Sequence, residues 1–436
     1  MINTVTKHNQ FHENGLKYFQ QSDPHLRALS ELAYQYGPTW WHDLSLKSPG
    51  IYILTGGRQI GKSTSCKLLI AHCLQKKLFE PKNILYLPCD EIFDAKELSS
   101  TIRFFLASTN DEKFLLIIDE VTFVKDWERV IKALADEGYF RHGLCILTGS
   151  DTLILKEAAM SFPGRRGNAD PVDFHIYPLT FYEYVDLVYG KKSPNKQQLS
   201  DYFNDYLQCG GYLRAINDYA AHKKILPSTF LTYEQWIRGD FLKHAKREDV
   251  LLLLLQALFS IGVSQASYST ITQKMGLVSK DTVIDYCELL GRMDVLFYLQ
   301  AFDQNKKLGF PKKDRKFHFI DPFIYRTLHN WLLKEGYLNA IESESIIAEA
   351  CVASHCYRLG RTFYFKGQGE IDVIWLHDKK IKAIEVKWAN QIRSNDLKTL
   401  KHFENSIILC KGIREGIEHD VTVMPISQFL YEQRLT

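Results

Sequence analysis

Short apolar runs alternate with helix-length segments over residues 50–187 of this chain. The runs cover residues 51–54, 84–87, 114–118, 144–147 and 174–177. Strands that are apolar on both faces are typical of a parallel sheet covered by helices on both sides. The pattern therefore predicts an α/β core over this part of the chain.

The remaining segments differ from this core in character. Residues 1–49 are expected to form a helical lead-in, and the polar, aromatic stretch 188–245 a helical lid. Residues 246–330 contain two helical patterns and a basic turn, and residues 331–436 return to mixed helix and strand. At about 150 residues per domain, a chain of this length holds roughly three domains.

Composition limits the partners and the compartment. The net charge is only +3 over 436 residues, so a nucleic-acid partner must meet a local basic patch. Nine cysteines without a Cys-x-x-Cys pair favour a reducing compartment. Cys351 and Cys356 flank His355, but their spacing fits no usual zinc site.

The polar N-terminus lacks the apolar segment of a signal peptide, and the apolar run 250–261 is too short to cross a bilayer. A cytoplasmic protein without a membrane partner is expected.

The stretch TGGRQIGKST, residues 55–64, lies between an apolar strand and a helix. It contains the pattern Gly-x-x-x-x-Gly-Lys-Ser of a P-loop, whose backbone N–H groups and helix N-terminus bind phosphate. Lys62 is expected to reach the β- and γ-phosphates of ATP, and Ser63 to hold Mg²⁺. The expected nucleotide-binding residues are Gly56, Gly57, Arg58, Gln59, Ile60, Gly61, Lys62, Ser63 and Thr64.

A second apolar run delivers two acids to the carboxyl edge of the sheet, where ligands bind in open α/β folds. Asp119 is expected to hold Mg²⁺ through water, and Glu120 to orient the attacking water; the alternative is a helix cap. Thr148 and Ser150 follow a third run. They can contact the γ-phosphate or the attacking water, or form a simple turn.

The motifs TGGRQIGKST, LLIIDE, ILTGSD, FPGRRG, IYPLTFYEYV and YLQCGGYLRAI follow one another in the chain. Together they resemble prokaryotic AAA-type ATPases, in which the ATPase core precedes a winged-helix segment and a C-terminal nuclease-like domain. The resemblance implies that Arg165 is an arginine finger acting on a neighbouring subunit, in a homo-oligomer such as a hexamer. Arg166 is adjacent and competes for this role; the alternative is that both are surface residues.

Residues 268–299 indicate two helices and a strand, with Ser279 as the N-cap of the second helix. A basic hairpin follows, with Lys306, Lys307, Lys312, Lys313, Arg315 and Lys316. This order predicts a winged helix whose cations contact DNA phosphates. Winged helices also dock proteins, and Asp281, Asp285 and Glu288 on the second helix oppose a duplex.

The stretch GEIDVIWLHDKKIKAIEVKW, residues 369–388, is predicted to be a β-hairpin with its turn centred between Asp378 and Lys379. In that register Asp372 faces Glu385, and Lys387 lies on the same face. Two carboxylates and a lysine suit Mg²⁺ or Mn²⁺ and phosphodiester chemistry. The alternative is a solvated hairpin with ordinary cross-strand ion pairs.

The pattern Asp372-x₁₂-Glu385-x-Lys387, after the helix SIIAEACVASHCYRLG, resembles the restriction-endonuclease-like superfamily. This resemblance implies that Glu349 is a third acidic ligand.

We therefore expect an α/β chain: a P-loop NTPase parallel sheet with a helical lid, a winged helix, and a small α/β nuclease-like domain. Its expected activity is Mg²⁺-dependent ATP hydrolysis by an oligomer that binds DNA and couples turnover to DNA remodelling or cleavage. The alternative is a nucleotide-driven switch or adaptor that docks a protein and whose nuclease-like domain is inert.

Overall fold

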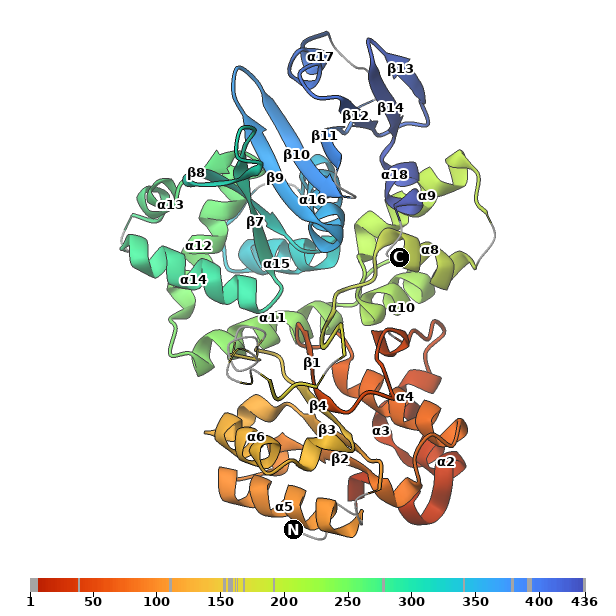
Figure 1. Cartoon of the computed structure of the whole chain (residues 1–436). Coiled ribbons are helices and arrows are strands. Elements are labelled where there is room, and N and C mark those ends of the chain that lie inside the picture. The colour runs from red at the N-terminus through yellow and green to blue at the C-terminus, as the bar shows by residue number, and fades with distance from the viewer. Residues whose placement is uncertain are drawn as a thin grey trace. The chain divides into compact units, whose positions relative to one another are not determined.

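The computed structural model of the chain forms two compact units, residues 1–177 and 178–436 (Figure 1). It describes residues 7–37, 40–109, 112–151, 154–155, 160, 162, 164–167, 169–190, 193–276, 279–339, 342–377, 380–389 and 394–433. The expected domain boundaries, including the end of the ATPase core at residue 187, stay predictions.

A parallel sheet forms the centre of the first unit, in the strand order β2-β3-β4-β1-β5. Its strands are β1 (Gly50–Gly56), β2 (Ile84–Pro88), β3 (Leu115–Asp119), β4 (Leu144–Thr148) and β5 (Asp173–Ile176). Each lies within two residues of a predicted apolar run, so the prediction of an α/β parallel sheet is confirmed.

Helices cover both faces of this sheet. Along β1, Ile51 and Ile53 pack into one buried cluster, whereas Tyr52 and Leu54 pack into another. The first cluster includes α5 (Ala95–Ser108) and α6 (Trp127–Asp136); the second includes α2 (Phe11–Ser22), α3 (Pro24–Ser30) and α4 (Lys62–Gln75). Because both faces are covered, the strands are apolar along most of their length.

Helices begin the second unit. They are α8 (Phe181–Tyr189), α9 (Lys196–Cys209), α10 (Leu213–His222), α11 (Pro227–Lys243) and α12 (Glu248–Ile261). The short strand β6 (Gln265–Ala266) follows, and then α13 (Tyr268–Met275) and α14 (Lys280–Arg292). Ser279 caps α14 by accepting a hydrogen bond from the Thr282 N–H at 3.1 Å, as expected.

A mixed sheet runs through the rest of this unit, in the order β13-β14-β12-β11-β10-β9-β7-β8-β6. Its long strands are β7 (Leu296–Asp303), β8 (Leu308–Phe319), β9 (Arg361–Lys366), β10 (Glu370–His377), β11 (Lys380–Lys387) and β12 (Asn405–Cys410). The strands β13 (Gly416–Glu418) and β14 (Val421–Pro425) complete one edge. The sheet also joins segments that were expected to form separate domains, because β7 pairs in parallel with β9.

The helices α15 (Pro322–Lys334), α16 (Glu344–Leu359) and α18 (Ile426–Glu432) accompany the later strands, and α17 (Ser394–Leu400) lies between β11 and β12. The helix α16 packs against β9, β10 and β11 (Figure 1). β10 pairs with β11 in the expected register, since Val373 lies opposite Ile384. The expected turn centre, Asp378 and Lys379, lies outside the described residues.

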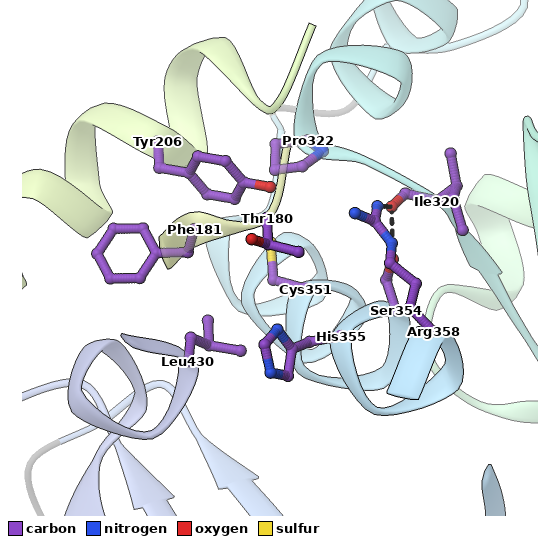
Figure 2. Close-up of a pocket in the computed structure, with 10 residues that line it drawn as sticks. All are labelled: Thr180, Phe181, Tyr206, Ile320, Pro322, Cys351, Ser354, His355, Arg358 and Leu430. Carbon is purple, nitrogen blue, oxygen red and sulfur yellow. Dashed lines mark hydrogen bonds between the residues drawn. The ribbon is translucent and has the colours of Figure 1, made fainter. Parts of the chain in front are cut away.

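His355 and Cys351 on α16 line a small cavity of about 20 Å³ in the second unit (Figure 2). Cys356 is buried and carries a free thiol. Within the described residues, no group of three His, Cys, Asp or Glu side chains is arranged to hold a metal ion. Also within that part of the chain, no helix is long and apolar enough to cross a membrane.

Candidate functional site

The loop between β1 and α4 takes backbone conformations that require glycine. Gly56 has φ 147°, and a Cβ there would lie 2.5 Å from the carbonyl oxygen of Ile176. Gly61, which directly precedes α4, has φ 97°. The chain therefore turns sharply from strand to helix at the predicted phosphate-binding loop, without side chains at the points of closest approach.

Lys62 is the first residue of α4, and its side chain turns back over the loop. Its ammonium donates hydrogen bonds to the carbonyl oxygens of Gly56 at 2.8 Å and Gly57 at 2.9 Å. Its Nζ also lies 3.8 Å from Oε1 of Glu120. The residue is only 5% exposed, so a cation is held inside the predicted phosphate site.

Asp119 ends β3 and is 4% exposed. Its Oδ2 accepts a hydrogen bond from the Tyr86 hydroxyl at 2.5 Å, and its Oδ1 accepts one from the Thr148 hydroxyl. Burial and the Asp119 charge raise the pKa of Tyr86, while a side-chain hydrogen bond with Ser63 acts in the opposite direction. The Tyr86 hydroxyl thus bonds both predicted Mg²⁺ ligands, Ser63 and Asp119.

Glu120 has a left-handed backbone, with φ 52°. Its Oε2 accepts hydrogen bonds from the backbone N–H of Ser150 at 3.0 Å and from the Ser150 hydroxyl at 3.1 Å. Its own N–H donates to Oγ1 of Thr148 at 3.1 Å. Glu120 is the N-cap of the 3₁₀ turn Val121–Phe123, although its side chain makes no cap hydrogen bond. Its carboxylate and its N–H instead bond Ser150 and Thr148, and the functional roles of these three residues stay predictions.

Arg165 and Arg166 have different partners in the first unit. The Arg165 side chain donates to Asp136 of α6. Arg166 donates to Oδ1 and Oδ2 of Asp173 at 2.6 Å and 2.9 Å, and to the carbonyl oxygen of Val172 at 2.9 Å. Arg166 therefore supports the edge of the sheet at β5, whereas Arg165 forms an ion pair on the outside of α6.

The N-terminal lead-in is attached to the P-loop helix. Asp23 and Lys67 form an ion pair at 2.8 Å, with side chains 5% and 3% exposed. Asp23 also caps α3 by accepting N–H groups of His25 and Leu26. Trp40 donates a hydrogen bond to Ser65. Polar groups far apart in the sequence therefore support the helix that carries Lys62.

The second unit contains a partly buried cluster of charged side chains (Lys316, Glu349, Glu370, Asp372, Glu385 and Lys387), called here the carboxylate cluster. Lys316, Glu349 and Asp372 are buried, whereas Glu370, Glu385 and Lys387 are partly exposed. Lys316 of β8 is 1% exposed, and its ammonium lies 2.8 Å from Asp372, 2.9 Å from Glu370 and 3.2 Å from Glu349. These carboxylates raise the pKa of Lys316 against the opposing effect of burial. The Lys387 ammonium lies 2.7 Å from Glu385.

Burial and the nearby charge of Asp372 raise the pKa of Glu349 well above its usual value, and that of Glu385 to about 7. Asp372 is 9% exposed, so the solvated-hairpin interpretation is wrong for it. The three predicted metal ligands, Glu349, Asp372 and Glu385, thus interact electrostatically. Hard carboxylate oxygens fit a divalent cation, but in this arrangement an ammonium already contacts two of these acids.

Lys316 was expected on an exposed basic hairpin, and this expectation is wrong. Strand alternation places Lys316 and His318 on one face of β8 and Phe317 and Phe319 on the other, and both faces are buried here. Arg315 is partly covered: its guanidinium lies over the rings of Tyr268 and Tyr298, at 4.7 Å and 5.4 Å. The exposed cations of the ribbon formed by β7 and β8 are Lys306, Lys307, Lys312 and Lys313.

Comparison with known proteins finds family models that match successive parts of the chain. Residues 48–185 match the family model described as an AAA domain. Residues 200–335 and 343–429 match two models, each described as a domain of unknown function. The parallel sheet, the P-loop and this AAA match define the first unit as a P-loop ATPase domain of the AAA type.

Proteins described as uncharacterised match most of the length of this chain. One from Haemophilus influenzae is 24% identical over 373 residues, which is 82% of this chain and 87% of that protein. One from Methanocaldococcus jannaschii is 24% identical over 422 residues, which is 87% of this chain and 84% of that protein.

Solved structures also resemble the chain. The Walker-type ATPase of Pyrococcus abyssi has a TM-score of 0.42 and 14% identity, over 64% of this chain and 91% of that chain. The ORC2 protein of Aeropyrum pernix, in its ADPNP-ADP complexes, has a TM-score of 0.39 and 12% identity, over 69% and 92%. Because these scores are low, the class assignment rests on the chain's own site and on the AAA match.

Proposed function

We propose that the first unit binds ATP with Mg²⁺ at the P-loop and hydrolyses it. The observation that carries this proposal is the approach of Lys62 to Glu120, 3.8 Å apart, beside the buried carboxylate of Asp119. A cation, a carboxylate for the metal and a carboxylate for water are the groups that phosphoryl transfer to water requires.

Each side chain has a role that its contacts support. The ammonium of Lys62 exchanges the loop carbonyl oxygens for phosphate oxygens when nucleotide binds. Ser63 and Asp119 would hold Mg²⁺, since a hydroxyl and a carboxylate are hard oxygen ligands, and the ion neutralises phosphate charge. Glu120, held by Ser150, orients the attacking water.

Two variants test this proposal in the purified full chain. Lys62→Ala should lower nucleotide affinity and turnover, and Glu120→Gln should retain ATP binding while turnover falls by about a hundredfold or more. Lys76→Ala, at the exposed end of the same helix, is the matched control. Undiminished turnover in Lys62→Ala contradicts the proposed site.

For Arg165, we propose the role of an arginine finger on the nucleotide of a neighbouring copy. Arg166 is the weaker candidate, because the β5 edge already uses both of its terminal nitrogens. Lys62→Ala and Arg165→Ala should each be inactive alone, whereas their mixture should regain turnover at sites that combine an intact loop with an intact arginine. A mixture that stays inactive contradicts action between subunits.

The ribbon of β7 and β8 supports a second function, contact with DNA phosphates. The order α12, β6, α13, α14, β7, β8, with β6 paired to β8, is that expected of a winged helix. Lys306, Lys307, Lys312 and Lys313 are exposed on the ribbon, whereas α14 presents acids. We infer that the ribbon, rather than α14, contacts the duplex, through the backbone and without reading sequence.

Salt dependence measures this contact. Replacing both Lys312 and Lys313 by alanine should reduce the slope of log K against log salt by about two. Replacing the exposed pair Lys223 and Lys224, after α10, is the matched control. If DNA neither binds the ribbon nor stimulates ATP turnover, the alternative of a switch or adaptor that docks a protein is favoured.

The order α16, β9, β10, β11, α17, β12 supports a restriction-endonuclease-like domain, with Asp372, Glu385 and Lys387 as the centre of phosphodiester cleavage. Asp372→Ala should abolish Mn²⁺-dependent nicking while ATP turnover stays intact. Wild-type protein that cuts no linear or branched DNA contradicts the cleavage function and leaves the ATPase proposal standing.

A further inference from the structure

Lys316 is the most deeply buried cation of the carboxylate cluster, at 1% exposure. Its partners come from two other elements, Glu349 from α16 and both Glu370 and Asp372 from β10. A β-bulge on the β10–β9 ladder lies at Asp372, between the paired residues Ile371 and Ile374. Bulges re-aim side chains, so this strand presents its carboxylate to the lysine by a local departure from regular pairing.

An ammonium is costly to bury unless carboxylates surround it. The carboxylates in turn need a nearby cation, because Glu349 and Asp372 are only 7% and 9% exposed. Lys387 contacts Glu385 at 2.7 Å. Lys316 is therefore the charge that permits Glu349 and Asp372 to be buried side by side.

Both oxygens of Asp372 are engaged in this arrangement. Oδ1 accepts a hydrogen bond from the Lys316 ammonium at 2.8 Å, and Oδ2 accepts one from the backbone N–H of Val386 at 2.9 Å. Glu349 uses Oε1 for the same ammonium, at 3.2 Å. A divalent ion that bound Oδ1 of Asp372 and Oε1 of Glu349 would compete with Lys316 for these oxygens.

We propose that the ammonium of Lys316 is the built-in cation of the cluster, and that a divalent metal binds its carboxylates only in exchange for that ammonium. This inference rests on the proposed metal-dependent centre, and it assigns to Lys316 a role that opposes the metal. Lys316 is a positioning residue: its ammonium holds Glu349 and Asp372 in the folded arrangement and prevents a divalent metal from binding them.

Binding of Mn²⁺ to nucleotide-free full-length protein tests the exchange, with free Mn²⁺ measured by electron paramagnetic resonance. Lys316→Met keeps the length of the side chain and removes its charge. This variant should bind Mn²⁺ more tightly than wild type by about tenfold or more, since a competing cation is gone. Lys316→Met combined with Asp372→Asn is the control, and the added affinity should disappear.

Thermal unfolding supplies a second readout. Without metal, Lys316→Met should melt below wild type, because it leaves carboxylates buried without their cation. Mn²⁺ should restore much of that loss in Lys316→Met and change wild type much less. A variant with a merely lost packing contact would not regain stability from a metal ion.

If Lys316→Met fails to fold even with Mn²⁺, the double variant Lys316→Met with Glu370→Gln removes one unbalanced charge and keeps Glu349, Asp372 and Glu385. The proposed exchange is wrong if wild type and the folded Lys316→Met variant bind Mn²⁺ with equal affinity. It is also wrong if neither protein binds Mn²⁺. If the affinity shift appears but no variant nicks DNA, the exchange stands and the proposed cleavage function fails.

Discussion

Ser150 holds Glu120 by two hydrogen bonds, one from its backbone N–H at 3.0 Å and one from its hydroxyl at 3.1 Å. The carboxylate that we assign to the attacking water is thus oriented by the loop after β4. The same loop supports Asp119, through Thr148. Hydrogen bonds between the ends of two neighbouring strands therefore arrange both acids before nucleotide binds.

Ser150→Ala removes only the hydroxyl bond, while the backbone bond remains. We expect turnover to fall by about fivefold, the equivalent of one hydrogen bond of about 1 kcal/mol, with ATP affinity unchanged. Steady-state kinetics should show this as a lower kcat at constant KM. Ser108→Ala, which removes the exposed hydroxyl at the end of α5, is the control. A loss as complete as that of Glu120→Gln would show that the hydroxyl itself acts on the substrate.

Tyr86→Phe removes the hydroxyl that bonds Asp119 and Ser63. The nucleotide-free protein should lose about 1–3 kcal/mol of stability, because a buried carboxylate loses a donor. Mg²⁺ with ADP should narrow the difference from wild type, since the metal then satisfies Asp119. Thermal unfolding with and without the ligand measures this. The result is contradicted if Mg²⁺ and ADP stabilise both proteins equally.

Lys67→Met should strongly destabilise the first unit, by about 3–5 kcal/mol, because Asp23 would stay buried without its partner. Combining it with Asp23→Asn should recover part of the loss, since no unpaired charge then remains. Denaturant unfolding of wild type, both single variants and the double variant gives the coupling free energy. Additive losses would contradict a direct buried ion pair.

The burial of His355 predicts that the free energy of unfolding depends on pH. Burial, aided by the charge of Arg358, lowers its pKa from 6.5 to about 4. The folded chain therefore binds the proton less well than the unfolded chain. The stabilising contribution is complete above pH 6.5 and is lost as the pH falls toward 4, by up to about 3 kcal/mol.

In His355→Gln, the loss of unfolding free energy between pH 6.5 and 4 should be smaller than in wild type. His222→Gln is the control, since this histidine is exposed at the end of α10. Urea unfolding at a series of pH values measures the difference. Parallel pH profiles for wild type and His355→Gln would contradict the assignment.

Local patterns indicated the residues of the proposed ATP site, because each of its parts is a short run of neighbouring residues. The P-loop residues 56–64 and the acids after β3 are each read from a few neighbouring residues. The hairpin register was also local, since one turn determines which residues of β10 and β11 face each other. Tyr86 was missed because its strand is apolar throughout, and the hydroxyl gives no signal within it.

Lys316 shows the limit of the sequence in the second unit. Its basic surroundings predicted an exposed hairpin, although the alternation in KFHF places Lys316 and His318 on one face of β8. The sequence does not reveal that both faces of β8 are buried there, with Phe317 and Phe319 on the opposite side, because that depends on the pairing of β7 with β9. The pairing of β8 with β7, and of β7 with the more distant β9, decides whether Lys316 contacts phosphate or Asp372.

By itself, the sequence predicted the parallel α/β core, the glycine-rich loop, the two acids at the end of β3 and the register of β10 against β11. These features depend on periodicity and turns, which act between near neighbours. Only the tertiary structure decided that Tyr86 bonds Ser63 and Asp119, and that Lys316 neutralises Glu349 and Asp372. A buried polar group must find partners wherever the fold places them, and strand order, rather than local pattern, sets that place.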